Sequence, residues 1–517
     1  MMRTAEAQHR RALPCLSRVA VSIAAVLLVV TGCSPSAGAR DTAPQQGTLF
    51  SRAELLEDVA YIFATIRDVH PNPHHRVDSA AVMRARQALE RGLHDDMSAV
   101  EFWRLAAPAV ALLRDGHTSL SRPDISSTSA VFPLVVKLDS TGATVRADLS
   151  DEARLPRGAR LLLINGRSVA SLVGEAMTTL PYERHAMRLW VVERVFGDLL
   201  PVLWDWRGPY EIEAELPSGE RLTAVLSPIS REEGNRRSEA AGLVPAPAPA
   251  FSYATLGDGV LGYIDLRLQL DVDRFERFLD ETFTRVREAP PCALVIDLRR
   301  NPGGSAEFGD LLMSYLAARP VRQYSRIDVR SSAQVKAHHR QRLPRPIRWL
   351  PAGAFGLADR RFGALLGSPD GAIVTWTEDE RLPRRNPLRW TGPVFVLTGV
   401  NTFSSGADLA AALQDYGLAT VIGEETGGLA SSYGESYASH LPHTALRLNV
   451  SYKYFVRPSG IEDDRGVVPD IVVAGDPGQT NGDPALDRVL QEVGPCAAQA
   501  DDLVHVDARA IRSHLSH

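Results

Sequence analysis

Two stretches in the C-terminal half place small and hydroxyl residues where acyl-transfer chemistry could use them. Residues 398–408 run from an apolar segment through Ser404 and Ser405 into a helical pattern. Such a serine can simply cap the helix, or it can act as a nucleophile whose developing negative charge the helix N-terminus favours. Residues 297–304 end in two glycines, whose backbone N–H groups can face a developing oxyanion without Cβ interference. A plain tight turn explains the glycines as well, so spacing alone leaves both questions open.

A candidate base occurs far upstream, in the stretch from Arg114 to Thr118. Its histidine, His117, follows Asp115-Gly116 at the end of a helical region. Imidazole has an unperturbed pKa near 6.5, so it can accept a serine proton at neutral pH and later donate it to a leaving amine. Taken alone, a single histidine before a threonine is more often an ordinary side chain than a catalytic one.

The C-terminal half that carries both stretches alternates between strand and helix patterns. Such alternation predicts a largely parallel sheet covered by helices. Residues 319–390 are rich in Arg and Pro with little periodicity and predict an insertion or a lid. The predicted strands cover residues 260–266, 293–298 and 393–398, and the predicted helices cover 272–287, 305–318 and 405–416.

The N-terminal half predicts a helical region followed by a β-rich one. Apolar residues recur at helical spacing over 55–69, 78–93 and 97–113. Short strands are expected within 131–145, and residues 158–169 form an apolar strand with an Asn-Gly turn, which predicts a hairpin. Residues 233–250 are polar and then rich in Pro and Ala, which indicates a linker.

Length and charge limit the possible classes of protein. A chain of 517 residues is long enough for about two to four domains. The net charge of -5 gives no reason to expect nucleic acid as a partner, because phosphate binding needs a concentrated basic excess. The pairs His74-His75 and His338-His339 lack acidic or cysteine partners at ligand spacing, so no metal is expected.

The N-terminus has the features of an export signal. Four arginines precede the apolar run 19–30, which is short for a membrane-spanning helix and leads to Val30-Thr31-Gly32-Cys33. This end resembles a bacterial lipobox. The resemblance implies cleavage before Cys33 and acylation of its thiol and amine, although an ordinary signal peptide is the alternative. Cys292 and Cys496 could pair in an exported protein, but their spacing is weak evidence for a disulfide.

Five motifs in the same order resemble the C-terminal-processing (tail-specific) and tricorn-like serine peptidase superfamily. The resemblance extends from about residue 55 to residue 490 and implies a nucleophile at Ser404. It also implies an oxyanion hole built from Gly303 or Gly304 together with Ser405. The motifs are "D-L-R-x-N-x-G-G" at 297–304, "T-F-S-[AS]-G" at 402–406, 423–428, 466–470, and the strand 262–264 with the helix 278–283.

The superfamily activates its serine in two ways, and the sequence favours the second. The lysine that one branch carries shortly after the 423–428 motif is missing, and Lys453 does not match its position. In the branch similar to tricorn's catalytic domain, a "D-G-H" segment supplies the base, which is His117 here. An acid before the 466–470 motif orients it, either Glu462 or Asp463. A further hydroxyl, from Ser405, Thr118 or Ser119, completes the relay.

The expected fold is therefore an α/β multidomain protein with a helical N-terminal region, a PDZ-like β-rich domain and a crotonase-like (ββα) α/β peptidase domain. The resemblance implies a serine peptidase, an endopeptidase rather than an exopeptidase, that acts on peptides or unfolded proteins and needs no cofactor. A non-hydrolytic binding protein and an esterase or amidase are the alternatives. The expected location is the cell envelope, lipid-anchored at the periplasmic face, with Ser34 favouring the outer membrane. The segments are 1–32 leader, 33–49 tether, 50–125 helical, 126–232 PDZ-like, 233–250 linker, 251–475 catalytic and 476–517 tail.

Overall fold

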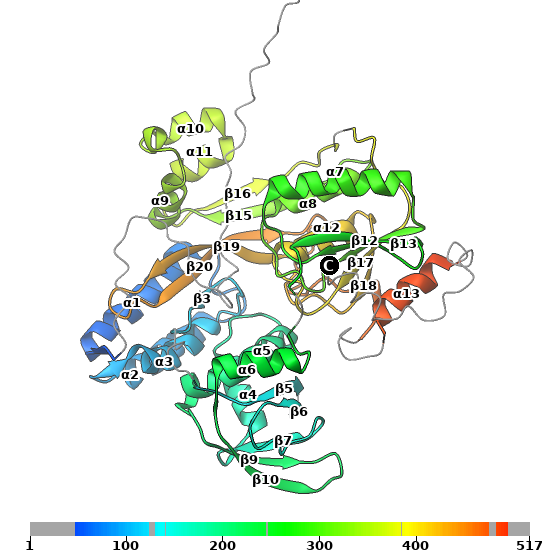
Figure 1. Cartoon of the computed structure of the whole chain (residues 1–517). Helices are drawn as coiled ribbons and strands as arrows, with labels where there is room; N and C mark the ends of the chain where they lie inside the picture. Colours follow the sequence, from blue (N-terminus) through cyan, green and yellow to red (C-terminus); the bar gives the residue numbers. More distant parts are fainter. Residues whose placement is uncertain are drawn as a thin grey trace, which may run out of the picture.

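The computed structural model describes residues 47–494 except for 124–129, 140, 245–246, 384 and 475–481. The predicted leader, the lipidation site Cys33 and most of the tether lie outside the described residues. Within these ranges, no helix combines the length and apolar character that a bilayer crossing requires. Figure 1 shows helices at the N-terminus, a middle domain beside them, and two sheets formed by the rest of the chain.

The central sheet confirms the predicted alternation of strands and helices. Its order is β12-β13-β14-β17-β18-β21, with β12 antiparallel to β13 and all other neighbours parallel. Alternate side chains of each strand point to opposite faces, so one face packs against α7, α8 and α12 and the other against α13. The elements are β12 (Phe251–Leu256), β13 (Leu261–Leu266), α7 (Val272–Glu288), β14 (Ala293–Asp297), α8 (Glu307–Leu316), β17 (Val394–Thr398), α12 (Ser405–Asp415), β18 (Thr420–Gly423), β21 (Ile471–Val472) and α13 (Pro484–Val493).

A second, antiparallel sheet contains strands from the segment 319–390, which differs from the predicted irregular insertion or lid. Its order is β16-β15-β20-β19, and β3 pairs with β20. The five-residue strands β15 and β16 are too short and too rich in polar residues to stand out in the sequence. The elements are β3 (Ser119–Leu120), β15 (Arg326–Arg330), α9 (Ala333–Gln341), η1 (Arg345–Ile347), α10 (Ala352–Ala358), α11 (Arg360–Gly367), β16 (Ile373–Thr377), β19 (Ser432–His440) and β20 (Arg447–Val456).

The N-terminal helices share one hydrophobic core with this second sheet. Leu55 and Ile62 of α1 are fully buried in the same cluster as Leu448 and Val450 of β20. Burial of apolar surface from both parts holds them together, and the strand pairing of β3 with β20 follows directly after the last of these helices. The elements are β1 (Leu49–Phe50), α1 (Arg52–Val69), α2 (Ser79–Gly92), β2 (Met97–Ser98) and α3 (Ala99–Ala111).

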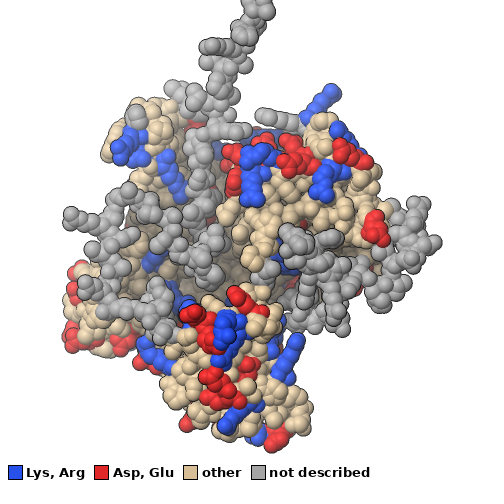
Figure 2. Space-filling view, viewed as in Figure 1, with Lys and Arg blue, Asp and Glu red and all other residues tan. Residues whose placement is uncertain are grey.

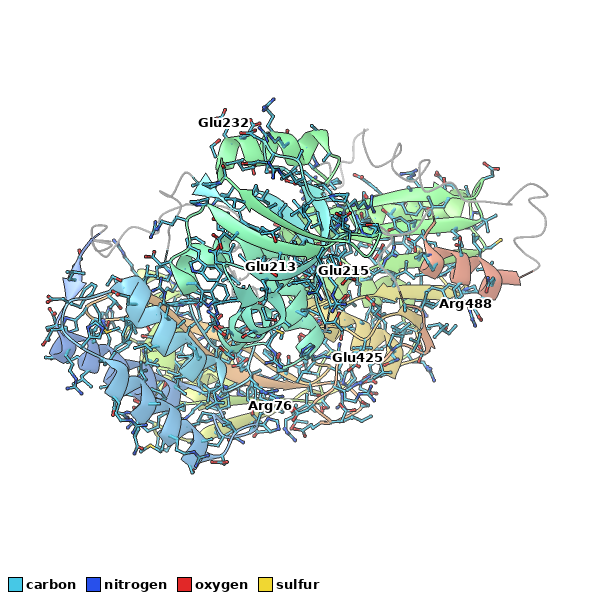
Figure 3. All side chains as sticks on the ribbon, turned by 90° about the horizontal axis from the view of Figure 1, so that it is seen from below. Arg76, Glu213, Glu215, Glu232, Glu425 and Arg488 are labelled. Atoms are coloured by element: carbon cyan, nitrogen blue, oxygen red, sulfur yellow. The ribbon has the colours of Figure 1, made fainter. Side chains whose placement is uncertain are left out.

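The middle domain contains a sheet of order β10-β9-β7-β6-β5, with β8 paired to β7. The predicted Asn-Gly hairpin is confirmed: Asn165 (φ 49°) and Gly166 (φ 72°) join β7 to β8. On β9, Glu213 and Glu215 lie two residues apart and point to the same face (Figure 3). The strands are β4 (Ala130–Val131), β5 (Leu134–Asp139), β6 (Gly142–Asp148), β7 (Arg160–Ile164), β8 (Arg167–Ser168), β9 (Tyr210–Glu215), β10 (Arg221–Leu226) and β11 (Ile229–Ser230).

This domain is less purely β-rich than predicted, because it contains α4 (Val169–Thr178) and the 20-residue helix α5 (His185–Trp204). α5 packs its apolar side chains against the sheet core. Glu193 of α5 also accepts a hydrogen bond of 2.9 Å from the backbone N–H of Leu138. Because Leu138 lies on β5, the edge strand of the sheet, this edge is covered from within the domain.

The predicted linker 233–250 begins with a helix instead, α6 (Arg231–Ala240). Ser230 caps it by accepting the N–H of Glu233, and the acidic side chains of its first turn complement the helix dipole. α6 contacts the short β4–β11 pair. Its sequence is polar all round, which explains why the pattern indicates a linker.

Acidic and basic side chains are interspersed on the face of the molecule in Figure 2.

Candidate active site

Ser404 lies at the junction of β17 and α12, as the N-cap residue of the helix. Its backbone has φ 52° and ψ -134°, a conformation that a non-glycine residue adopts only at a cost of about 1–3 kcal/mol. The side chain does not cap the helix, so the hydroxyl is free for another role. The strained turn therefore presents a hydroxyl at the N-terminal end of α12, where developing negative charge is stabilised.

The loop after β14 is bound tightly to this junction. Thr402 Oγ1 donates to the carbonyl oxygen of Leu298 at 2.7 Å, and the N–H of Phe403 donates to the carbonyl oxygen of Asn301 at 3.0 Å. Asn301 is completely buried and donates through Nδ2 to the Leu266 carbonyl. These bonds fix the glycine loop next to Ser404.

Both glycines of that loop have positive φ values, 102° at Gly303 and 145° at Gly304. A Cβ on Gly303 would lie 2.8 Å from the Cβ of Ser404, and one on Gly304 would lie 2.2 Å from the carbonyl oxygen of Gln269. The N–H of Gly303 donates to Asn301 Oδ1. No described residue accepts a hydrogen bond from the N–H of Gly304 or Ser405, so these two donors are available to a ligand.

The structure brings His117 to Ser404 from the other end of the chain. Nε2 of His117 lies 3.0 Å from Oγ of Ser404. Two contacts hold the loop in place: β3 begins two residues after the histidine and pairs with β20, and Ser436 Oγ donates to the His117 carbonyl. The imidazole also stacks on Phe403, with ring centroids 5.0 Å apart. The structure thus brings together the two residues that the sequence predicts as nucleophile and base.

A buried carboxylate, Asp115, organises the histidine loop. Its Oδ1 accepts the backbone N–H of His117 at 3.0 Å, and its Oδ2 accepts the Thr118 hydroxyl and faces His70 Nε2 at 3.1 Å. Burial opposes ionisation of Asp115, but the hydrogen bond and charge of His70, with His117, outweigh it and lower its pKa. The sequence motif contains Asp115, but nothing in the sequence indicates its partner His70, which lies 45 residues upstream.

Burial also lowers the pKa of His117, and the negative charge of Asp115 and the backbone carbonyl of Tyr433 oppose this shift only in part. Nδ1 of His117 is buried and has no hydrogen-bond partner of standard geometry among the described residues. The Tyr433 carbonyl is close enough to favour the protonated ring without forming such a bond. The imidazole is therefore neutral at neutral pH, as a general base requires.

The two acids that the resemblance implied lie elsewhere. Glu462 pairs with Arg326 of β15 at 2.9 Å, and Asp463 accepts the backbone N–H of Arg465. Neither contacts His117 in the described structure. Arg326 of β15 therefore neutralises Glu462 away from the imidazole.

The remaining relay and base candidates also have partners of their own. The Ser405 hydroxyl donates to the Gly304 carbonyl, Thr118 to Asp115, and Ser119 accepts from an asparagine on β20. None of these three hydroxyls contacts the imidazole of His117. Lys453 pairs with Glu435 at 2.8 Å rather than approaching Ser404.

The middle domain contacts the site through the loop between α4 and α5, which the sequence analysis missed. The rings of Tyr182 and Phe403 meet edge to face, and Glu183 accepts the N–H of Gly116 at 3.2 Å. Burial first, and then the charge of Asp115, raise the pKa of Glu183 to about 7. Arg184 pairs with Glu425 at 2.9 Å. These contacts join the middle domain to both sides of the active site.

No group of three or more His, Cys, Asp or Glu side chains in the described part of the chain could hold a metal ion. Cys292 is disulfide-bonded. Cys496, whose pairing with Cys292 the sequence leaves open, lies outside the described residues.

The comparison with protein families concerns the domain that carries Ser404 and the glycine loop. Residues 261–473 match the model of peptidase family S41. This segment is similar to the peptidases of family S41. The match supports a serine-type peptidase of the S41 superfamily, whereas His117 and the middle domain lie outside the matched residues.

Solved structures show a similar arrangement over most of the chain. A structure of mature CPAF complexed with lactacystin is 15% identical, with a TM-score of 0.56, and the match covers 88% of this chain and 98% of that chain. A mutant of CPAF is 14% identical over the same shares of the two chains, with a TM-score of 0.59. At these identities the likeness concerns the fold, a mixed α/β multidomain architecture that includes the parts outside the S41 domain.

Proposed function

We propose that this S41 protein hydrolyses peptide bonds through an acyl-enzyme on Ser404, with His117 as the base. The observation that carries the proposal is the 3.0 Å separation between His117 Nε2 and Ser404 Oγ at the strained N-terminus of α12. A nucleophile and a base within hydrogen-bond reach are the geometric requirement for covalent catalysis. Five matching motifs in the sequence add independent support.

In the first half-reaction, Ser404 Oγ attacks the scissile carbonyl carbon while His117 Nε2 takes the hydroxyl proton. The tetrahedral oxyanion is stabilised by the free N–H groups of Gly304 and Ser405, with Gly303 leaving space beside the nucleophile. Collapse breaks the C–N bond, and His117 returns the proton to the departing amine. In the second half-reaction, water gives a proton to His117 and its oxygen attacks the ester carbonyl, which releases the acid and restores Ser404.

Asp115 is the positioning residue in this proposal, in place of Glu462 or Asp463. It binds the backbone of the histidine loop, and its buried negative charge favours the imidazolium that forms during attack. Asp115 thus has a role similar to that of the acid in a Ser-His-acid triad. The acid of such a triad accepts a hydrogen bond from Nδ1 of the histidine, whereas Asp115 binds the backbone of the histidine loop.

The proposed substrate is a peptide or unfolded protein segment cleaved internally and bound as an added strand. The covered edge of β5 argues against a peptide adding to the sheet of the middle domain at that edge. We propose that the middle domain, which the sequence predicts to be PDZ-like, instead positions the active-site loops. It contacts them through Tyr182, Glu183 and Arg184.

The test is labelling of the purified chain with a fluorophosphonate probe, followed by peptide mapping. The wild type is expected to carry the adduct on Ser404, and both Ser404→Ala and His117→Ala are expected to abolish it. A folded wild type without any adduct would favour the non-hydrolytic binding protein. An adduct on Ser404 together with turnover of small esters but not of peptides would favour the esterase or amidase.

Location is a separate proposal that rests on the lipobox-like segment ending at Cys33. Two acyl signals on one residue would anchor the protein stably without a spanning helix. Growth with an alkyne fatty acid should label the wild type but not Cys33→Ala. Label retained by the variant would exclude this anchor.

A further inference from the structure

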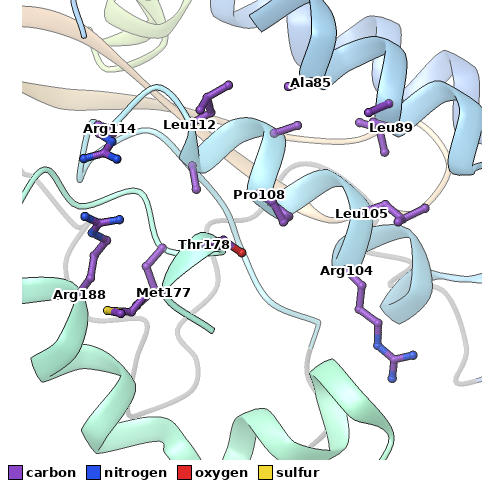
Figure 4. Close-up of a pocket in the computed structure, with 14 residues that line it drawn as sticks. Ala85, Leu89, Arg104, Leu105, Pro108, Leu112, Arg114, Met177, Thr178 and Arg188 are labelled. Atoms are coloured by element: carbon purple, nitrogen blue, oxygen red, sulfur yellow. The ribbon is translucent and has the colours of Figure 1, made fainter. Parts of the chain in front are cut away.

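A cavity of about 500 Å³ lies between the N-terminal helices and the middle domain, and Ser404 is not among the residues that line it. It is bounded by α2 and α3 on one side and by the end of α4 and the start of α5 on the other (Figure 4). Its volume falls within the range of about 300–1,000 Å³ that is usual for small-molecule sites. The apolar lining consists of Ala85, Ala88, Leu89, Leu105, Pro108, Ala109, Ala111, Leu112, Met177 and Leu180.

The charged residues that line the cavity are all positive. Arg104, Arg114 and Arg188 line the cavity, and no acidic residue does. In Figure 4, the side chains of Arg114 and Arg188 lie together at one end of the cavity, whereas Arg104 lies at the other. Thr178, the only other polar lining residue, donates its hydroxyl to the Glu175 carbonyl.

The three arginines differ in what they bind. The guanidinium of Arg104 donates to the backbone carbonyls of Pro201 and Val202 and is therefore occupied. Nε of Arg188 is buried without a partner, and no described carboxylate pairs with Arg188 or with Arg114. Burial, followed by the positive charge of Arg114, lowers the pKa of Arg188. The two positive charges repel each other, and an anion bound between them would relieve this repulsion.

We propose that this cavity binds a medium-chain aliphatic carboxylate, with the chain among the aliphatic side chains and the carboxylate between Arg114 and Arg188. A planar guanidinium matches the two oxygens of a carboxylate. The lining offers almost no hydrogen-bond partners along the length of the cavity. An aliphatic chain needs none, whereas a peptide would bury unpaired backbone N–H and C=O groups there.

The anionic end of the ligand would lie at the surface, because Arg114 is exposed. Arg114 also directly precedes Asp115, so the bound carboxylate would lie beside the loop that carries His117. The binding itself does not depend on the proposed peptidase activity, and the experiment below measures binding alone.

The test is isothermal titration of the purified full chain with decanoate below its micelle concentration. Decan-1-ol and the decyltrimethylammonium cation serve as ligands with a similar chain and a different head. We expect decanoate to bind at least about tenfold more tightly than the alcohol, and the cation not to bind. The double variant Arg114→Gln/Arg188→Gln should lose this preference while still binding decan-1-ol as the wild type does.

Two further variants separate site, charge and folding. Arg154→Gln/Arg157→Gln removes two exposed positive charges from the middle domain and should leave decanoate binding unchanged. Ala88→Phe places a ring at the cavity and should weaken both decanoate and decan-1-ol at least about tenfold, with an unchanged circular dichroism spectrum.

Several results would overturn the proposal: no binding of decanoate to the wild type, equal affinity for the acid and the alcohol, or equal affinity in the double variant. An apolar peptide with a free C-terminus that binds where decanoate does not would assign the cavity to a peptide instead.

Discussion

His70 Nε2 lies 3.1 Å from Asp115 Oδ2, and both side chains are almost completely buried, with exposed fractions of 2% and 1%. A buried carboxylate that retains its charge needs such partners, and here they include the N–H of His117 and the hydroxyl of Thr118. The charge is thus fixed next to the imidazole that must become positive during catalysis. This relationship makes Asp115 testable apart from the catalytic pair.

Replacement of Asp115 by Asn should slow fluorophosphonate labelling of Ser404 by at least about tenfold, a loss of about 1.4 kcal/mol. Without the negative charge the pKa of His117 should fall further, so the midpoint of the pH–rate profile should move to lower pH. Glu462→Gln and Asp463→Asn are the matched controls and should change the rate less than about twofold. A larger effect at either control than at Asp115 would restore the acid that the family resemblance implies.

The pH dependence of labelling should report His117. Burial lowers its pKa, so the rate should be constant near neutral pH and should fall as the pH drops through a midpoint below the usual 6.5 of imidazole. The rate constant is measured from about pH 4.5 to 8 at constant ionic strength, with circular dichroism at each pH. A midpoint above 6.5 would show that the imidazolium, rather than the neutral ring, is favoured in the site.

Gly303→Ala should abolish labelling while leaving a folded protein. The new Cβ would lie 2.8 Å from the Cβ of Ser404 and 3.0 Å from the N of Ser405, so it would displace the nucleophile or the oxyanion donor. Gly371→Ala is the matched control, because that glycine also has a positive φ, 87°, but has no atom within 4 Å of the added Cβ. Both variants should lose about 1 kcal/mol of stability from backbone strain, and only the first should lose activity. Normal labelling of Gly303→Ala would contradict the proposed geometry.

Glu183 should make the protein less stable as the pH rises. Its pKa in the folded protein is about 7, above the ordinary 4.5, so between these values the folded chain holds a proton that the unfolded chain has lost. Its contribution to stability therefore falls from about pH 4.5 to about pH 7 and is constant above. Glu183→Gln should remove this part of the dependence and raise stability at pH 8 by on the order of 2 kcal/mol.

The measurement is urea unfolding of wild type and variant at pH 5 and pH 8. The exposed Glu213 of β9 provides the control, Glu213→Gln, which should show the same pH dependence as the wild type. An unchanged difference between pH 5 and pH 8 in Glu183→Gln would show that Glu183 is not protonated in the folded protein.

The sequence predicts the central sheet well because β13, β14 and β17 are fully buried and α7 is strongly amphipathic. Phe275, Leu279 and Phe283 recur at helical spacing on α7 and are all fully buried. It predicts the second sheet poorly, because β15 and β16 have only five residues each and β20, the partner of β15, lies more than 100 residues further along the chain. Pairing between distant short strands leaves no local pattern.

The residues of the candidate site also fall into those that the sequence predicts and those that it does not. Ser404, the two glycines and His117 stand in recognisable local motifs, and the structure brings them together. The partner of Asp115 could not be predicted, because His70 reaches it only through the packing of α1 against the second sheet. Likewise, Glu462 has a plausible place in the sequence, but Arg326 from a distant strand binds it.

The sequence separation of 287 between His117 and Ser404 has a consequence for the timing of activity. During synthesis or export the histidine loop emerges long before the serine, and it gains its position only when β20, at residues 447–456, has paired with β3. Partly made or partly folded chains therefore lack a working pair of catalytic groups. A copy that has not finished folding would therefore be unable to cleave other chains.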